Sequence, residues 1–275
     1  MLETEKRNPA TTHIDTADTA TMLRMMQEAN RRSVDAVGEA LDAVAQAVDA
    51  AAEALSNGGR IIYVGAGTSG RLAVQDAAEC PPTFGVDYDT VVALIAGGEK
   101  AVFRAVEQVE DSAEAGRADL EAKKLEPKDF VVGISASGNA PYVASALAYA
   151  REVGCRTAAI SSNRECRLAE VADIFVFTDT GPEVITGSTR LKAGNAQKMV
   201  LNMISTCAMV KTGKVCENLM VNLRPTNRKL RERMVGIVRD LAGVGEDVAL
   251  AALGAHGFVI RAAVSALRGG KIQVQ

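Results

Sequence analysis

The chain has 275 residues, 48% of them hydrophobic and 24% charged, and a formal net charge of -3. This is the composition of an ordinary globular protein, with room for one sizeable α/β domain and a smaller helical part. Lysine and arginine are spread along the chain, whereas binding to a nucleic-acid backbone needs them gathered on one face, so we expect no nucleic-acid partner.

Residues 1–16 are polar and rich in threonine, and we expect an irregular arm there. No apolar run follows the charges near Met1, so the arm does not have the pattern of a secretory signal peptide. No uninterrupted apolar stretch of the sequence is long enough to span a bilayer. We therefore expect a cytoplasmic protein without a membrane partner.

A helical pattern runs from about Asp18 to Leu55. Between Val34 and Ala54 the apolar residues recur three and four positions apart, as they do on the buried face of an amphipathic helix. The run Asn57–Gly59 follows, and Asn and Gly commonly end helices. The sequence predicts a long N-terminal helix whose apolar face packs either within the chain or against a second copy.

Five short runs rich in β-branched residues come next, each followed by a turn or a helical segment. Strands that alternate with helices indicate βαβ crossovers, and hence a mainly parallel sheet covered on both faces. The predicted strands are Arg60–Val64, Thr90–Ile95, Phe130–Ile134, Thr157–Ser161 and Ile174–Phe177. A long, largely buried helix is predicted over Lys192–Lys211.

The pattern changes after Gly213, and no further strands are expected between the helices that follow. Arg224 and Pro225 interrupt the pattern, which places a boundary near residues 214–225. Three short helices are predicted, at Thr226–Leu241, Gly245–Leu253 and Gly257–Leu267. We predict an N-terminal arm and helix at residues 1–45, an α/β domain at 46–214 and a C-terminal helical segment at 215–275.

Cysteine and histidine indicate little chemistry of their own. The odd number of cysteines and the absence of a CxxC pair are typical of reduced thiols in a cytosolic protein. The two histidines, His13 and His256, lie apart from any pattern of a serine triad or a metal site. If the protein performs acid–base chemistry, carboxylates are the expected agents.

A glycine-rich loop follows the first predicted strand and opens a helix. Residues Gly65–Gly70 read GAGTSG, which fits the GxGxxG pattern of dinucleotide sites. That interpretation also requires an acidic residue at the end of the second strand. The strand ends instead in Ala96–Gly98, while Asp87 and Asp89 precede it. The sequence therefore disfavours a nicotinamide cofactor.

The same loop suits a single phosphate. Gly67 allows close approach of the backbone, Thr68 and Ser69 add hydroxyl groups, and the helix that follows offers unpaired N–H groups. A second loop repeats the arrangement after the third strand, with Ser135, Ser137 and Gly138. Either loop alone is equally well explained as helix capping by Ser and Thr, but two such loops at the same edge of a parallel sheet favour a phosphate ligand.

This pair of loops resembles the sugar isomerase (SIS) domain, which binds phosphosugars through Ser/Thr loops. A third segment, EVITGSTRLK at Glu183–Lys192, resembles the Ser-Thr-Lys/Arg segment that leads into a long helix in that fold. The resemblance implies an α/β, three-layer fold with a mainly parallel sheet between helices, here followed by a small all-helical C-terminal segment. Ser188 and Thr189 in this segment join the predicted phosphosugar contacts. Lys192 and Arg190 are candidates to support the anionic substrate, although long basic side chains are usually solvated.

Longer motifs resemble one family, the N-acetylmuramic acid 6-phosphate etherases, from about Asn8 to about Leu267. They are GAGTSGRLAVQDAAECPPTFG (65–85), LIAGGEKAV (94–102), AVEQVEDS (105–112), VITGSTRLKAGNAQKMVLNMIST (184–206) and GKVCENLMVNL (213–223). The resemblance implies a lyase that cleaves the lactyl ether by elimination from the open-chain aldehyde, followed by addition of water. The products are D-lactate and N-acetylglucosamine 6-phosphate, in cell-wall amino-sugar recycling.

The resemblance also assigns two catalytic residues. It makes Glu79 the acid–base residue at the ether oxygen, and it matches Glu110 to the second catalytic glutamate, a candidate base for the C2 proton. Glu107 and Asp111 flank Glu110, so spacing alone does not select it. The implied chemistry requires no metal and no other cofactor, and the family implies a homodimer.

Two other functions share this fold: an aldose–ketose phosphosugar isomerase and a non-enzymatic phosphosugar-sensing regulator. The long etherase motifs disfavour the isomerase, and the presence of both Glu79 and Glu110 favours catalysis. Two features depart from the family pattern. Asn139-Ala140-Pro141 stands where Arg-Thr-Pro is usual, and the sequence ends without the final helical segment that the family implies.

Overall fold

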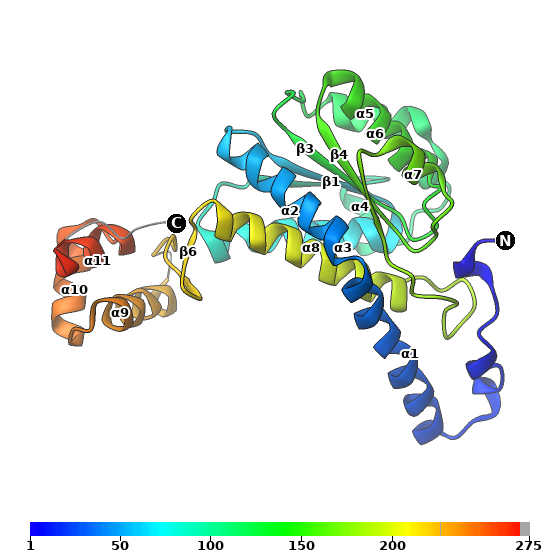
Figure 1. The fold of residues 1–275 in the computed structure, drawn as a ribbon, viewed down its shortest axis with the longest axis horizontal. Helices are drawn as coiled ribbons and strands as arrows, with labels where there is room; N and C mark the ends of the chain where they lie inside the picture. The colour runs from blue at the N-terminus through cyan, green and yellow to red at the C-terminus, as the bar shows by residue number, and fades with distance from the viewer. Residues whose placement is uncertain (226, 270–275) are drawn as a thin grey trace.

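The computed structural model describes residues 1–225 and 227–269, and its centre is a five-stranded parallel sheet (Figure 1). The strand order is β2-β1-β3-β4-β5. The strands are β1 (Ile61–Gly65), β2 (Val91–Ile95), β3 (Phe130–Ile134), β4 (Arg156–Ser161) and β5 (Ile174–Phe177). Each lies within one residue of its predicted range, and the predicted parallel pairing is confirmed.

Helices cover both faces of the sheet because neighbouring strand residues point to opposite sides. Ile61 and Tyr63 belong to one apolar cluster, whereas Ile62 and Val64 belong to another. The first cluster is shared with α2 (Leu41–Ser56), α3 (Gly67–Phe84) and α8 (Lys192–Lys211). The second is shared with α5 (Ala113–Glu121), α6 (Pro141–Val153) and α7 (Arg167–Val171). The three-layer α/β fold is confirmed.

The predicted N-terminal helix is two helices, α1 (Thr19–Glu39) and α2, which meet at Ala40. α2 packs on the sheet, whereas the first turns of α1 extend away from it (Figure 1). The arm before α1 contains three short 3₁₀ turns, η1 (Glu3–Glu5), η2 (Pro9–Thr11) and η3 (Ile14–Thr16). It is held to the domain by hydrogen bonds from Glu3 N to Asn163 Oδ1 (2.7 Å) and from Thr11 Oγ1 to Val184 O (2.8 Å).

The C-terminal helices lie to one side of the sheet and have an apolar cluster of their own. They are α9 (Arg228–Ala242), α10 (Glu246–Ala255) and α11 (Ile260–Arg268), close to the predicted ranges. The predicted start at Thr226 and the predicted short end at residues 270–275 lie outside the described residues. An antiparallel pair that was not predicted, β6 (Val215–Cys216) and β7 (Leu219–Met220), precedes these helices.

Among the described residues, no helix taken singly is both long enough and apolar enough to cross a membrane. α10 and α11 pass that test of length and composition only when they are joined, and they are bent by 115° at the break between them.

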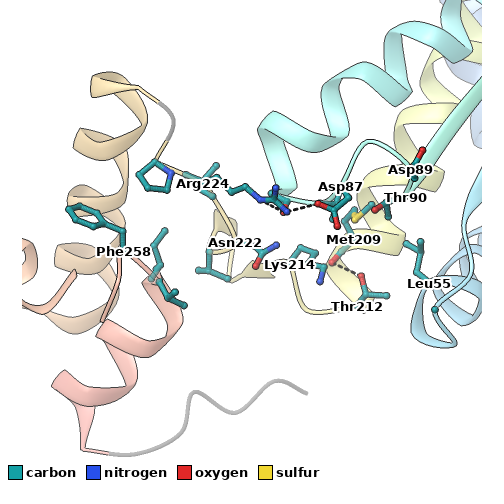
Figure 2. A pocket seen from close by; sticks show the side chains of 18 of the residues that line it. Leu55, Asp87, Asp89, Thr90, Met209, Thr212, Lys214, Asn222, Arg224 and Phe258 are labelled. Atoms are coloured by element: carbon teal, nitrogen blue, oxygen red, sulfur yellow. Dashed lines mark hydrogen bonds and ion pairs between the residues drawn. The ribbon is translucent and has the colours of Figure 1, made fainter. Parts of the chain in front are cut away.

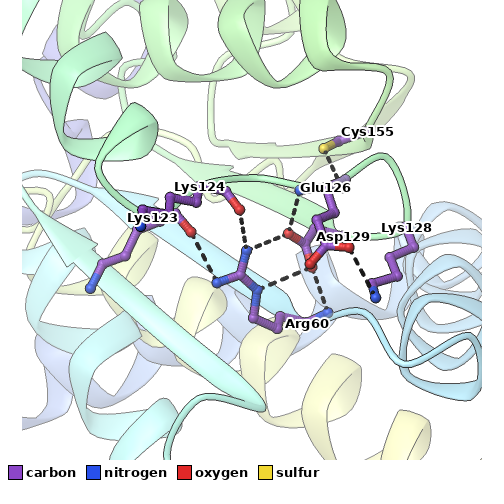
Figure 3. A network of polar contacts seen from close by, with 7 residues as sticks. All are labelled: Arg60, Lys123, Lys124, Glu126, Lys128, Asp129 and Cys155. Atoms are coloured by element: carbon purple, nitrogen blue, oxygen red, sulfur yellow. Dashed lines mark hydrogen bonds and ion pairs between the residues drawn. The ribbon is translucent and has the colours of Figure 1, made fainter.

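An ion-pair network fixes the start of β1 to the start of β3, as Figure 3 shows. Arg60 donates to the Asp129 carboxylate through its backbone N (2.9 Å), Nε (3.2 Å) and Nη2 (2.6 Å). Its guanidinium also donates to the carbonyl oxygens of Lys123 and Lys124. Asp129 is 2% exposed, so the pair is largely shielded from water.

We expect Asp129→Asn to lower the free energy of unfolding by about 3 kcal/mol at pH 7, because it leaves the Arg60 charge without its partner. Burial alone would raise the pKa of Asp129, but hydrogen bonds from Arg60 and from backbone N–H groups lower it overall. A lowered carboxyl pKa contributes stability above the unfolded-state pKa of about 4, and that stability is lost as the pH falls through the folded-state value.

Urea unfolding at pH 7 and at successively lower pH tests this expectation. The difference between wild type and variant is expected to shrink below about pH 4. Asp49→Asn is the matched control, because Asp49 forms an exposed pair with Lys211 (2.7 Å) and such pairs contribute at most about 1 kcal/mol. Equal losses for the two variants at pH 7 would contradict the expectation.

Candidate active site

The two predicted phosphate loops leave adjacent strands at the same edge of the sheet. Gly65 of β1 pairs with Ile134 of β3, so the loops begin side by side, about 5 Å apart. Ala66, which precedes α3, has no side chain that caps the helix, so the first turn keeps N–H groups for a bound anion. A Cβ on Gly70 would lie 2.5 Å from Ile95 Cγ1, so glycine is needed where α3 packs against β2.

The third predicted segment reaches the first loop. A Cβ on Gly194 in α8 would lie 3.5 Å from both Thr189 O and Thr68 Cγ2. The start of α8 therefore lies against the first loop, with Thr189 beside Thr68. Ser188 donates its backbone N–H to Ile185 O (2.9 Å) in the turn that leads there.

The hydroxyl groups of the second loop contact each other and the local backbone. Ser135 Oγ and Ser137 Oγ are 3.2 Å apart, and Gly138 N donates to Ser135 Oγ (3.1 Å). Asn139 N donates to Ser137 Oγ (3.2 Å). Each serine oxygen keeps capacity for another partner, because a hydroxyl both donates and accepts. The geometry is compatible with phosphate binding and with turn capping alike, so the roles of these serines stay predictions.

Gln197 of α8 contacts the first loop and was not among the residues predicted from the sequence. Ser69 is 7% exposed and donates to Gln197 Oε1 (2.9 Å). Gln197 is 1% exposed, and its Nε2 has no hydrogen-bond partner among the described residues. A buried amide group without a protein partner is uncommon, and this Nε2 is free to donate to a ligand or a water. Only its place in the motif at 184–206 pointed to it in the sequence.

Lys192 lies at the N-terminus of α8 and is buried. The backbone N–H groups of Lys192 and Ala193 both donate to the carboxylate of Glu183, each at 3.0 Å. Burial lowers the pKa of the Lys192 ammonium, and the Glu183 charge opposes that shift. Glu183 therefore occupies N–H groups of α8 that a phosphate would otherwise use. Phosphate binding by Lys192 stays a prediction.

The two predicted catalytic glutamates lie on different sides of the sheet. Glu79 is exposed on α3, ten residues after Ser69, which is about 15 Å along a helix. α3 packs on the face of the sheet that carries α2 and α8. Glu110 lies in the turn η4 (Val109–Asp111), whose Val109 packs with the cluster on the opposite face. The structure does not bring these two side chains together within one chain.

Glu110 does lie near the loop edge of the sheet. α4 (Glu99–Phe103) follows β2 and precedes η4. Arg71, in the first turns of α3, donates from Nε to Val102 O (3.0 Å) and from Nη2 to Arg104 O (3.1 Å). These bonds attach the segment that carries Glu110 to the helix that begins at the first loop.

A buried carboxylate lies next to Glu79. Asp76 is 6% exposed and accepts hydrogen bonds from Asn202 Nδ2 (2.6 Å), Tyr63 OH (3.1 Å) and Ser205 Oγ (3.2 Å). Burial raises the pKa of Asp76, and these donors offset part of the shift. Burial also raises the pKa of the neighbouring Cys80 thiol to about 12, which makes it a poor nucleophile. Neither Asp76 nor Cys80 was predicted from the sequence to belong to this network.

A cavity of about 940 Å³ lies at the other end of the sheet, between the C-terminal segment and the starts of β1 and β2. Figure 2 shows Arg224 bound to Asp87 across it, with Lys214, Asn222 and Phe258 in the wall. None of the predicted site residues lines this cavity. Within the described residues, no group of three or more His, Cys, Asp or Glu side chains is placed to hold a metal ion.

The solved structures that resemble this chain support the fold. A phosphoheptose isomerase from Francisella tularensis matches with a TM-score of 0.51 and 16% identity, over 69% of this chain and 96% of that one. A phosphoheptose isomerase from Neisseria gonorrhoeae matches with a TM-score of 0.51 and 18% identity, over 69% and 98%. The model of the glucokinase regulatory protein N-terminal SIS domain matches residues 43–151. The SIS-type fold is confirmed.

Curated relatives match most of the chain. The N-acetylmuramic acid 6-phosphate etherase of Francisella tularensis subsp. novicida is 49% identical over 88% of this chain and 83% of the relative. The protein of that name from Cronobacter sakazakii is 53% identical over 96% and 89%. That from Bacillus pumilus is 47% identical over 97% and 88%. The chain therefore belongs to the N-acetylmuramic acid 6-phosphate etherase family.

Proposed function

We propose that this chain is a lyase that cleaves the D-lactyl ether of N-acetylmuramic acid 6-phosphate in cell-wall amino-sugar recycling. The products are D-lactate and N-acetylglucosamine 6-phosphate. The proposal rests mainly on sequence identity. The chain is 49% and 53% identical to two etherases, over 88% and 96% of its length. The loops after β1 and β3 begin side by side, which supports a phosphate site for such a substrate.

The proposed reaction proceeds from the open-chain aldehyde. Glu110 removes the C2 proton, and the C3–O bond breaks to leave a double bond between C2 and C3. Glu79 gives its proton to the departing lactate oxygen and then, as a carboxylate, removes a proton from water that adds at C3. Glu110 returns its proton to C2. The residues divide the roles of base and acid, and both end in their starting protonation states.

We propose that two copies of the chain form each site. C2 and the ether oxygen on C3 belong to neighbouring carbons, so both carboxyl groups must reach the same few atoms. Within one chain Glu79 and Glu110 lie on opposite faces of the sheet. A homodimer in which Glu79 of the partner subunit faces the loops and Glu110 of the first copy satisfies the chemistry. α1 also exposes two large apolar side chains, Leu23 (62%) and Val34 (60%).

The direct test is incubation of the protein with N-acetylmuramic acid 6-phosphate, with enzymatic detection of D-lactate. Stoichiometric release of lactate is the expected result. Ketose formation without lactate would point to an isomerase, and substrate binding without either product would point to a phosphosugar sensor. Either outcome would overturn the proposed reaction.

We expect Thr68→Val to raise the KM for the phosphosugar about tenfold or more with a smaller effect on kcat, because a hydroxyl bond to a charged phosphate contributes about 1.5–3 kcal/mol. Phosphate is bound equally in the ground state and the transition state, so its loss acts on KM. Initial rates across substrate concentrations check this. Thr16→Val, an exposed threonine of the arm, is the control. An unchanged KM for Thr68→Val would remove Thr68 from the phosphate site.

We also propose the division into residues 1–45, 46–214 and 215–275 as arm and helix, phosphosugar domain and C-terminal segment. The separate apolar cluster of α9, α10 and α11 supports the last boundary.

A further inference from the structure

A small pocket between α3 and α8 contains Glu79. Its volume is about 100 Å³, and Gln75 and Leu72 of α3 and Lys198 and Asn202 of α8 also line it. Pockets that bury a drug-sized ligand are usually about 300–1,000 Å³. This smaller pocket suits a ligand fragment of a few heavy atoms.

The inner wall of the pocket is held in place by the Asp76 network. Asn202 donates one N–H to Asp76 (2.6 Å), and Ser205 Oγ, one turn further along α8, donates to the same oxygen of Asp76 at 3.2 Å. Tyr63 OH of β1 donates to the other oxygen (3.1 Å). Asn202 keeps its second N–H and its carbonyl oxygen for a ligand. An amide fixed in this way binds without first losing side-chain freedom.

Lys198 supplies the positive charge of this pocket. Its side chain is exposed, it forms no salt bridge with another described residue, and its charge acts on the nearby Asp76 carboxyl, whose pKa it lowers. The other charged groups in the wall, Glu79 and Asp76, are carboxyl groups. An unpaired ammonium beside an acid–base glutamate, in a space for a small fragment, fits an anionic fragment that carries an oxygen to be protonated.

We propose that this pocket binds the lactyl group of the substrate, with its carboxylate on Lys198 and Asn202. The proposal rests on the proposed function. In the substrate, a single carbon separates the lactyl carboxylate from the ether oxygen, so an acid that protonates this oxygen lies beside the carboxylate. Lys198 offsets the repulsion between that carboxylate and the Glu79 carboxylate that forms as the proton leaves. The pocket thereby selects lactyl ethers among phosphosugars.

The test combines two enzymes with two substrates. Lys198→Met is compared with wild type on N-acetylmuramic acid 6-phosphate and on its analogue in which the lactyl carboxylate is a carboxamide. We expect wild type to prefer the acid by about 10- to 100-fold in kcat/KM, the usual range for a charge-assisted bond. Lys198→Met is expected to lose that preference, and Lys198→Arg to keep most of it.

Two controls separate this role from a structural one. Lys211→Met changes the same charge at the end of the same helix, where Lys211 pairs with Asp49, and is expected to leave the preference unchanged. Inhibition by N-acetylglucosamine 6-phosphate, which has no lactyl group, is expected to be the same in wild type and in Lys198→Met. Equal loss on acid and amide substrates, or no loss on either, would overturn the proposal.

Binding measured by calorimetry tests the lactyl pocket independently of the proposed reaction. If wild type releases no lactate, the reaction is wrong, and the pocket is judged by affinity alone. Tighter binding of the acid than of the amide by wild type, with no such difference for Lys198→Met, supports the pocket. Equal affinities in wild type would overturn it.

Discussion

Glutamine in place of either Glu79 or Glu110 is expected to lower the rate of lactate release by about 10²- to 10⁴-fold, the range for loss of a general acid or base. Glutamine keeps the shape of the side chain but neither gives nor takes a proton. Both residues are exposed, so the free energy of unfolding of each variant is expected to lie within about 0.5 kcal/mol of the wild-type value. Glu107→Gln is the matched control, since this exposed glutamate lies near Glu110 and has no assigned role.

The two variants are expected to fail at different steps. In deuterated water, Glu79→Gln is expected to exchange the C2 proton of the substrate without breaking the ether, because its base remains. Glu110→Gln is expected to show neither exchange nor cleavage. Proton NMR of the substrate follows both events. Loss of exchange in Glu79→Gln with retained exchange in Glu110→Gln would reverse the two roles, and a rate within twofold of wild type for either variant would remove that residue from the mechanism.

The central strands were predictable because they are buried on both faces. Such strands are continuous apolar runs, and Phe130–Ile134, which is buried throughout, matches its predicted range. The break between α1 and α2 was not predictable from the sequence. It occurs at Ala40, and alanine favours helix. Beyond the break α2 packs on the sheet, whereas α1 contacts α8. The strands β6 and β7 are two residues each, too short for a periodic pattern.

The loops of the site were predictable for a local reason. Glycine and hydroxyl residues directly after a strand fix both the turn and its place at the sheet edge. The contacts of Gln197 and Asn202 were not predictable. Each residue contacts α3 only because two helices more than 100 residues apart in sequence pack together. The sequence of a long buried helix does not show which residues of another element its single polar side chains contact. The separation of Glu79 from Glu110 likewise depends on which face each connection covers.

That separation leads to an expected result for mixed dimers. Glu79→Gln and Glu110→Gln are each nearly inactive alone, yet equal mixtures that exchange subunits are expected to recover about a quarter of the wild-type rate per chain. Random pairing makes half of the dimers mixed. In each mixed dimer, one site receives both wild-type glutamates and the other receives neither, so one site in four is intact.

The measurement is lactate release after the two variants are coexpressed with different tags and the doubly tagged dimer is purified. This dimer is expected to have about half of the wild-type rate, since one of its two sites is intact. A dimer of Glu79→Gln with the double variant Glu79→Gln/Glu110→Gln is the control and is expected to stay inactive, because neither site can obtain a wild-type Glu79. If each site lies within one chain, every site of the mixed dimer lacks one glutamate, and no recovery follows. An inactive but stable mixed dimer would therefore mean that Glu79 and Glu110 do not act on one substrate across the interface, and the assignment of Glu79, the more distant from the loops, would be the first to be replaced.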